Sequence, residues 1–92
     1  MHVTVEYFGP AREAIGTARE EVDCTPPLSA QDLVTRIARS RGGRLASLLL
    51  HDDRLSPALL LAVNDGQVAG DPVPLKDGDV VSIIPPVSGG AG

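Results

Sequence analysis

Apolar and polar positions alternate from the second residue to the eighth, and this period of two predicts a half-buried strand over His2–Phe8. The side chains of Val3, Val5 and Tyr7 are expected to point to one face of this strand, and those of His2, Thr4, Glu6 and Phe8 to the other. Pro10 suits the first turn of a short helix over Ala11–Ile15, which Gly16 ends. A more polar stretch, Thr17–Val22, is expected to pair back on the first strand as a second strand.

The clearest helical pattern lies in the middle of the chain, after two consecutive prolines. Ser29 offers its hydroxyl as the N-cap, and Asp32 stands three residues later, where a capping box has its acidic residue. The apolar stripe that follows has helical spacing and consists of Leu33, Val34, Ile37 and Ala38. Gly42 and Gly43 end this main helix, and Arg44–Leu50 predicts a further helical turn.

The last part of the chain predicts strands joined by turns. His51–Arg54 is expected to be a polar loop, and the continuous apolar run Leu59–Val63 is typical of a strand buried on both faces. Residues 64–66, Asn-Asp-Gly, are a strong tight-turn signal, so Gln67–Ala69 should return as a short antiparallel strand. Val80–Ile84 is expected to be the last strand.

This order of elements favours an α+β fold in which a mixed sheet of four to five strands packs on one main helix. The first and last strands are both apolar enough to lie at the centre of the sheet. The pattern suits a β-grasp, a sheet that curls around one helix. We expect residues 1–86 to form a single domain and residues 87–92 a flexible C-terminal tail.

Composition argues against two classes of partner, nucleic acids and membranes. The 92 residues carry a formal net charge of −4, so nucleic acid is not an expected partner. No basic leader is present and no apolar run approaches the roughly 20 residues that span a bilayer, so we expect no membrane partner and a cytoplasmic location. Because only Tyr7 and Phe8 are aromatic, the core is expected to be aliphatic.

Groups that could perform catalysis or bind metal are few. His2 and His51 lack helical spacing and neighbouring cysteines, so two solvated histidines are favoured over a metal site. Cys24, the single cysteine, has no nearby histidine or lysine and is interpreted as a half-buried structural thiol rather than a nucleophile. We expect the chain itself to bind neither a metal nor a cofactor.

The C-terminal tail contains three of the ten glycines. One interpretation is a frayed terminus, the ordinary state of small residues at a chain end. The other is a functional arm, because glycines lack a Cβ and a partner can enclose their backbone in a narrow channel. An extended stretch over residues 85–90 reaches roughly 20 Å, and a carboxylate at its end can be activated by a second enzyme. A carrier of this kind needs no catalytic residues of its own.

Three segments resemble one known family. The longest is Leu75–Gly90, with the sequence LKDGDVVSIIPPVSGG, and the others are Val3–Gly16 and Leu61–Gly66. Together they resemble the ubiquitin-like sulfur carriers, in particular the small subunits of molybdopterin synthase. They lie in the order that this family has and cover about forty residues of the chain.

The resemblance implies a β-grasp fold and a carrier subunit of a sulfurtransferase complex, not an enzyme on its own. An ATP-dependent, ubiquitin-activating-like adenylyltransferase would adenylate the carboxylate of Gly90, which would become a thiocarboxylate. The large synthase subunit would then receive the tail, with Gly89 and Ser88 threading into it. The residues expected to dock on partners are Phe8, Pro86 and Val87.

This sequence departs from the family pattern because Ala91 and Gly92 follow the glycine pair. We expect a tail-trimming metalloprotease to cut between Gly90 and Ala91; the alternative acceptor is Gly92 itself. Two other functions stay open at this point. One is a sulfur carrier for cysteine, thiamine or a secondary metabolite, and the other is a non-carrier ubiquitin-like modifier or interaction module.

Overall fold

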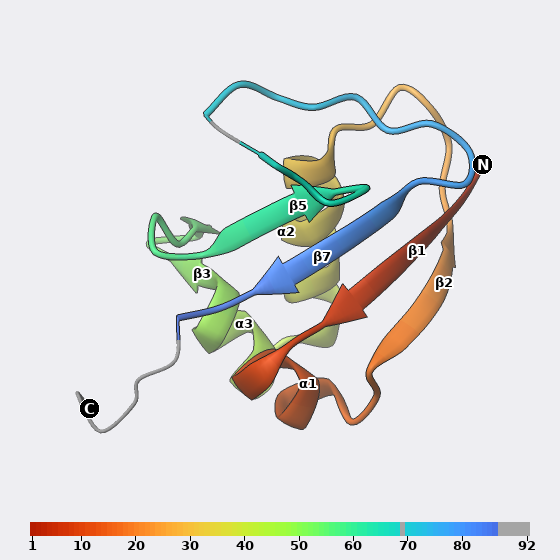
Figure 1. Ribbon diagram of the computed structural model, residues 1–92. Coiled ribbons are helices and arrows are strands. Elements are labelled where there is room, and N and C mark those ends of the chain that lie inside the picture. The colour runs from red at the N-terminus through yellow and green to blue at the C-terminus, as the bar shows by residue number, and fades with distance from the viewer. Residues whose placement is uncertain (69, 87–92) are drawn as a thin grey trace.

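A five-stranded mixed sheet carries the fold, and helix α2 crosses one of its faces (Figure 1). The computed structural model describes residues 1–68 and 70–86. In spatial order the strands are β2 (Arg19–Asp23), β1 (His2–Tyr7), β7 (Val80–Ile84), β5 (Leu60–Val63) and β6 (Gly66–Gln67). Strands β1 and β7 are parallel, and the other neighbours are antiparallel. The predicted α+β, β-grasp architecture is confirmed, and so is the central position of the first and last strands.

Three helices pack beside the sheet. They are α1 (Gly9–Ile15), α2 (Ala30–Arg41) and α3 (Gly43–Leu49). The cap predicted for the main helix is present, because the Asp32 amide donates a 3.0 Å hydrogen bond to the Ser29 hydroxyl. Gly42 ends α2 with a positive φ of 62°, which a residue without a Cβ adopts easily. No helix in residues 1–68 or 70–86 has the length and hydropathy needed to cross a bilayer.

The core lies between the sheet and α2. Its buried apolar residues come from β1, β7 and the predicted helical stripe, and include Val3, Val5, Val34, Ala38, Val81 and Ile83. The expectation of a purely aliphatic core is wrong, because Tyr7 is only 2% exposed. The Tyr7 hydroxyl donates a 2.5 Å hydrogen bond to Glu20 Oε2, which allows the ring to be buried without an unsatisfied polar atom.

Several predicted boundaries are corrected by backbone pairing. Strand β1 ends at Tyr7 rather than Phe8, because Phe8 is the N-cap of α1, which begins at Gly9 instead of Ala11. Strand β6 covers only Gly66–Gln67; Val68 lies beyond it, and Ala69 is outside the described residues.

The expectation that Leu59–Val63 is buried on both faces is wrong. Helix α2 covers only one face of β5, so Leu61 is buried while its neighbour Leu60 is 49% exposed. A continuous apolar run can therefore also belong to a strand that has one open face.

The polar segment His51–Arg54 is a hairpin turn rather than an unstructured loop. Strands β3 (Leu50–His51) and β4 (Arg54–Leu55) pair antiparallel on either side of Asp52 and Asp53. Both aspartates have positive φ, 53° and 64°, which is the geometry of a two-residue turn that matches strand twist. Aspartate tolerates this backbone region better than most residues, so the acidic pair also has a conformational role.

Candidate functional site

Two neighbouring rows of side chains cross strands β1, β7 and β5 near the end from which the tail leaves. The buried row consists of Tyr7, Ile83 and Leu61, which stand in register and face α2. Side chains alternate between the two faces of a strand, so the next register position faces the open side of the sheet. The exposed row at that position consists of Phe8, Ile84 and Leu60.

The exposed row is an unusual surface for so small a domain. Phe8 is 44% exposed and Leu60 is 49% exposed, while the remaining large hydrophobic residues in the described part of the chain are more shielded. The Phe8 amide donates a 3.1 Å hydrogen bond to the Ile83 carbonyl, so the backbone beneath the ring still belongs to the sheet. A contiguous apolar patch held on rigid strands is typical of a protein-binding site.

The exposed side continues toward the tail. Along this stretch Ile83 and Pro85 are buried, Ile84 is partly buried and Pro86 is exposed. This alternation is that of an extended backbone, so Pro86 extends the exposed row in the direction of residue 87. Two consecutive prolines also restrict the backbone at the point where the described chain ends.

The structure brings two of the predicted docking residues to one edge of the molecule. Phe8 and Pro86 both lie on the exposed side beside the end of β7. The other predicted site residues are outside the described residues, and their roles stay predictions: Val87, Ser88, Gly89, Gly90 and Ala91.

Leu60 and Ile84 were missed as surface residues by the sequence interpretation. Both sit inside apolar runs, where neither alternation nor composition distinguishes the open face from the covered one. The signal that identifies them is the pairing of Leu60 with Ile84 across β5 and β7, which depends on knowing which strands are neighbours.

The opposite end of β7 is anchored by a polar turn. Asp79 accepts 2.8 Å and 2.9 Å hydrogen bonds from the Lys76 amide and the Asn64 side chain. The bond from the Lys76 backbone, followed by that from Asn64, holds the pKa of Asp79 below its usual range. The Thr4 amide donates to the Asp79 carbonyl at 2.9 Å, so β1 is tied to the same turn. This frame fixes the register of β7 and with it the position of the exposed row.

The two histidines and the cysteine considered as candidate ligands or nucleophiles are separated from one another in the fold. Within residues 1–68 and 70–86, no group of three or more histidine, cysteine or acidic side chains could hold a metal ion. His2 pairs with Asp23 at 2.7 Å and His51 with Asp52 at 3.6 Å, both at the exposed surface. Cys24 is half-buried, as expected, and its backbone exchanges hydrogen bonds with Met1. The exposed row itself is apolar, and beside it on the same face the Ser82 hydroxyl donates a 3.4 Å hydrogen bond to Glu6 Oε1.

The fold and this surface define a class of protein: a ubiquitin-like β-grasp domain with an apolar patch beside the end of its last strand. A family model described as the ThiS family matches residues 5–90. The chain belongs to this family, the ubiquitin-like sulfur carriers, as the resemblance had implied.

Curated relatives and solved structures agree with this assignment. The chain is 33% identical to a molybdopterin synthase sulfur carrier subunit from Drosophila erecta, over 98% of this chain and 92% of the relative. A chain in the complex of subunits 1 and 2 of molybdopterin-converting factor from Helicobacter pylori is similar at 28% identity and a TM-score of 0.62. That match covers 97% of this chain and 99% of the other.

A third similarity concerns the fold alone. Small archaeal modifier protein 1 from Haloferax volcanii has a TM-score of 0.78 at 19% identity, over 94% of this chain and 98% of that chain. Backbones of this shape therefore persist across sequences that share few residues.

Proposed function

We propose that this chain is a sulfur carrier of molybdopterin biosynthesis, loaded on the carboxylate of Gly90 after the residues that follow Gly90 are removed. The observation that carries the proposal is the exposed row of Phe8, Ile84 and Leu60 at the root of the tail. Family membership and the glycine pair at 89 and 90 support the same function.

The exposed row suits a carrier because the surface that docks on a partner is separate from the tail that reacts. A partner that packs on rigid strands can orient the domain while the tail enters its active site. Glycines at the end of the tail suit a channel too narrow for side chains. The carrier then contributes its terminal carboxylate and an apolar docking surface, and the partner contributes the catalytic groups.

A free carboxylate has no good leaving group, so it must be activated before sulfur can replace one of its oxygens. An oxygen of the Gly90 carboxylate attacks the α-phosphorus of ATP, and pyrophosphate leaves. A hydrosulfide-level sulfur donor then attacks the acyl carbon and AMP leaves, which produces the thiocarboxylate. Once the sulfur has been transferred to the pterin precursor, water at the acyl carbon restores the carboxylate. ATP is bound by the activating adenylyltransferase in this cycle, and the carrier holds no cofactor.

Three partners follow from this cycle: the activating adenylyltransferase, the large synthase subunit and a protease that exposes Gly90. The activating enzyme and the large subunit would dock on the same exposed row, so their binding would be mutually exclusive. The relative from Helicobacter pylori forms a complex of its two subunits, which supports docking on a larger subunit. We place the cut between Gly90 and Ala91 and assign the cut to a metalloprotease.

Mass spectrometry tests the proposal directly. The chain ending at Gly90 is incubated with the activating enzyme, ATP and sulfide, and its intact mass should rise by the exchange of one oxygen for one sulfur. Gly90→Val should fold normally and lose sulfur transfer to the large subunit. A matched substitution outside the tail, Gly70→Val, should leave transfer unchanged, because a Cβ there meets no atom within 4 Å.

Protein recovered from its own cells discriminates the remaining alternatives. Loss of one alanine and one glycine supports trimming, whereas a full-length thiocarboxylate would identify Gly92 as the acceptor. A Gly-Gly remnant on substrate lysines would identify a modifier instead. A carrier for cysteine, thiamine or a secondary metabolite would load normally yet fail to supply the large synthase subunit. Full activity of the Gly90→Val variant would refute every form of the carrier proposal.

A further inference from the structure

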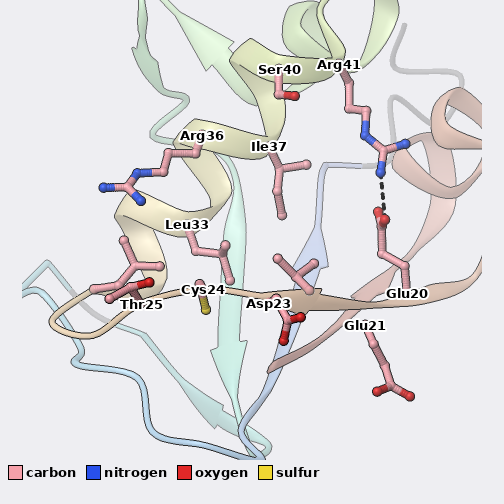
Figure 2. Close-up of a pocket in the computed structure, with 12 residues that line it drawn as sticks. Glu20, Glu21, Asp23, Cys24, Thr25, Leu33, Arg36, Ile37, Ser40 and Arg41 are labelled. Carbon is pink, nitrogen blue, oxygen red and sulfur yellow. Dashed lines mark hydrogen bonds and ion pairs between the residues drawn. The ribbon is translucent and has the colours of Figure 1, made fainter. Parts of the chain in front are cut away.

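A groove runs between edge strand β2 and helix α2, on the opposite side of the sheet from the exposed row (Figure 2). Its volume is about 560 Å³. Its walls are apolar at depth, formed chiefly by Val22, Leu28, Leu33 and Ile37. The half-buried thiol of Cys24 also lines it. The groove therefore combines an apolar floor with an edge strand along its full length.

The backbone of β2 has free hydrogen-bonding groups on its outer edge. The Ala18 carbonyl accepts from the Tyr7 amide, and Cys24 exchanges bonds with Met1, so even-numbered residues bond inward to the β1 side. In an antiparallel ladder the intervening residues point their amides and carbonyls outward. Those residues include Glu21 and Asp23, and no strand within residues 1–68 or 70–86 pairs with them. Such an edge is a template for one more strand.

The side chains around this edge are divided by charge between the two faces. On the groove face, Glu20 is already neutralised by Arg41 at 2.6 Å, and Arg36 stands on the rim. On the open face, Arg19 lies opposite Glu6 of β1, which leaves two acidic side chains for a partner. Glu21 has no ion-pair partner among the described residues, and Asp23 pairs with the exposed His2. Figure 2 shows Glu21 and Asp23 pointing away from α2, whereas Arg36 and Arg41 extend from the helix.

These charges specify the residues of an added strand. Its side chains would alternate between the groove and the open face. The groove would take aliphatic side chains over Val22 and Ile37, and the arginines of α2 would repel cations there. The open face would take lysine or arginine beside Glu21 and Asp23, as opposite charges attract across neighbouring strands. A shift of one residue would reverse both preferences, so the pattern also fixes the register.

We infer that the groove between β2 and α2 binds an extended peptide segment in which aliphatic and basic residues alternate. The segment adds to β2 as a sixth strand and belongs to a partner protein, not to this chain. Five residues of β2 correspond to about 17 Å of extended chain, so a short segment fills the site. The site lies away from the exposed row, and a partner held here can remain bound while the tail is loaded or discharged.

A synthetic peptide of alternating valine and lysine, capped at both ends, is the probe. Added to the full chain labelled with ¹⁵N, it should shift the amide resonances of Glu21 and Asp23 and leave those of Phe8 and Leu60 unchanged. Because Cys24 is the only cysteine and lines the groove, its alkylation by iodoacetamide should slow several-fold when the peptide is bound. A peptide with N-methylated central residues should not bind, because it lacks the ladder donors.

Charge reversal sharpens the test. Glu21→Lys should lower the affinity for the valine–lysine peptide about tenfold at low salt and should raise the affinity for a valine–glutamate peptide. The control is Glu13→Lys, the same change on the exposed surface of α1, which should leave affinity unchanged. Neither variant should alter sulfur loading at Gly90, so a failure here is distinct from a failure of the carrier proposal.

Four results would overturn the inference. The first is alkylation of Cys24 at an unchanged rate, with unshifted β2 amide resonances, when the valine–lysine peptide is added. The second is equal affinity for the valine–lysine and valine–glutamate peptides. The third is a shift of resonances at the exposed row, and the fourth is pairing of β2 with a second copy of this chain. Sedimentation of the chain alone detects the last of these.

Discussion

The buried row and the exposed row lie one residue apart on the same three strands, yet one is covered by α2 and the other is open to solvent. Tyr7, Ile83 and Leu61 face α2, and each is no more than 6% exposed. Phe8 and Leu60 keep nearly half of their surface open to solvent. Both rows are apolar, so hydrophobicity does not distinguish them. The position of α2 does, because it covers one face of the sheet and leaves the other for a partner.

The largest effect should come from removing side-chain volume from the buried row. Ile83→Ala leaves a cavity at a position with no exposed surface, and such changes cost about 2–5 kcal/mol of the free energy of unfolding. Thermal unfolding should show a drop of more than about 10 °C in Tm. Urea unfolding gives the free energy directly, and a loss below about 1 kcal/mol would mean that this row is not the stabilising one.

The exposed row should behave in the opposite way. Leu60→Ala should change the free energy of unfolding by less than about 0.5 kcal/mol. The same variant should weaken binding to the large synthase subunit or the activating enzyme about tenfold, as apolar anchors at interface centres do. Titration calorimetry measures the affinity, and Thr35→Ala on α2 is a control distant from the row. Unchanged affinity for both partners would remove Leu60 from the docking surface.

The polar turn at the opposite end of β7 should have an intermediate effect on stability. Asp79→Ala removes acceptors for the Lys76 amide and the Asn64 side chain, which should cost about 1–2 kcal/mol. Since the folded-state pKa of Asp79 is lowered, its contribution is present above the unfolded pKa of about 4 and disappears as pH falls through the folded value. Stability curves of the two proteins should therefore converge in acid. Parallel curves down to pH 2 would contradict this role.

Among the changes expected to destabilise the fold, the smallest effect concerns the one polar atom of the buried row. Tyr7→Phe removes the bond to Glu20 and should cost about 1 kcal/mol at neutral pH. Burial, followed by the Glu20 hydrogen bond, raises the pKa of Tyr7, so its contribution is full below the unfolded pKa of about 10 and is lost as pH rises above it.

The alkaline titration can be followed without labels. The chain has one tyrosine and no tryptophan, so phenolate absorbance reports Tyr7 alone. Ionisation should coincide with unfolding above pH 10, whereas ionisation of the intact fold at pH 10 would show that the ring is accessible.

The sequence predicts elements well where local chemistry decides them. The Ser29 hydroxyl caps α2 by accepting from the Asp32 amide, Gly42 ends the helix, and the apolar stripe between them is buried. The turn at residues 64–66 joins antiparallel strands as expected. The central position of the first and last strands follows from their apolar character.

The candidate site was less accessible to sequence reasoning, and the reason is geometric. Phe8 and Pro86 are predicted from the family resemblance, as apolar residues around the root of the tail. Leu60 and Ile84 are hidden in apolar runs, and only the pairing of β5 with β7 assigns them to the open face. The groove beside β2 depends likewise on tertiary packing, since its floor combines residues from α2 and from the strand.

The parallel pairing of β1 with β7 also has a consequence for synthesis. Thr4 contacts Val80, and Glu6 lies beside Ser82, 76 positions further along the chain. Such long loops close late, and β7 separates β1 from β5, so the sheet cannot be completed while Ile84 is still inside the ribosome. The exposed row needs β1, β7 and β5 in register, so it forms only once the chain has been synthesised past Ile84.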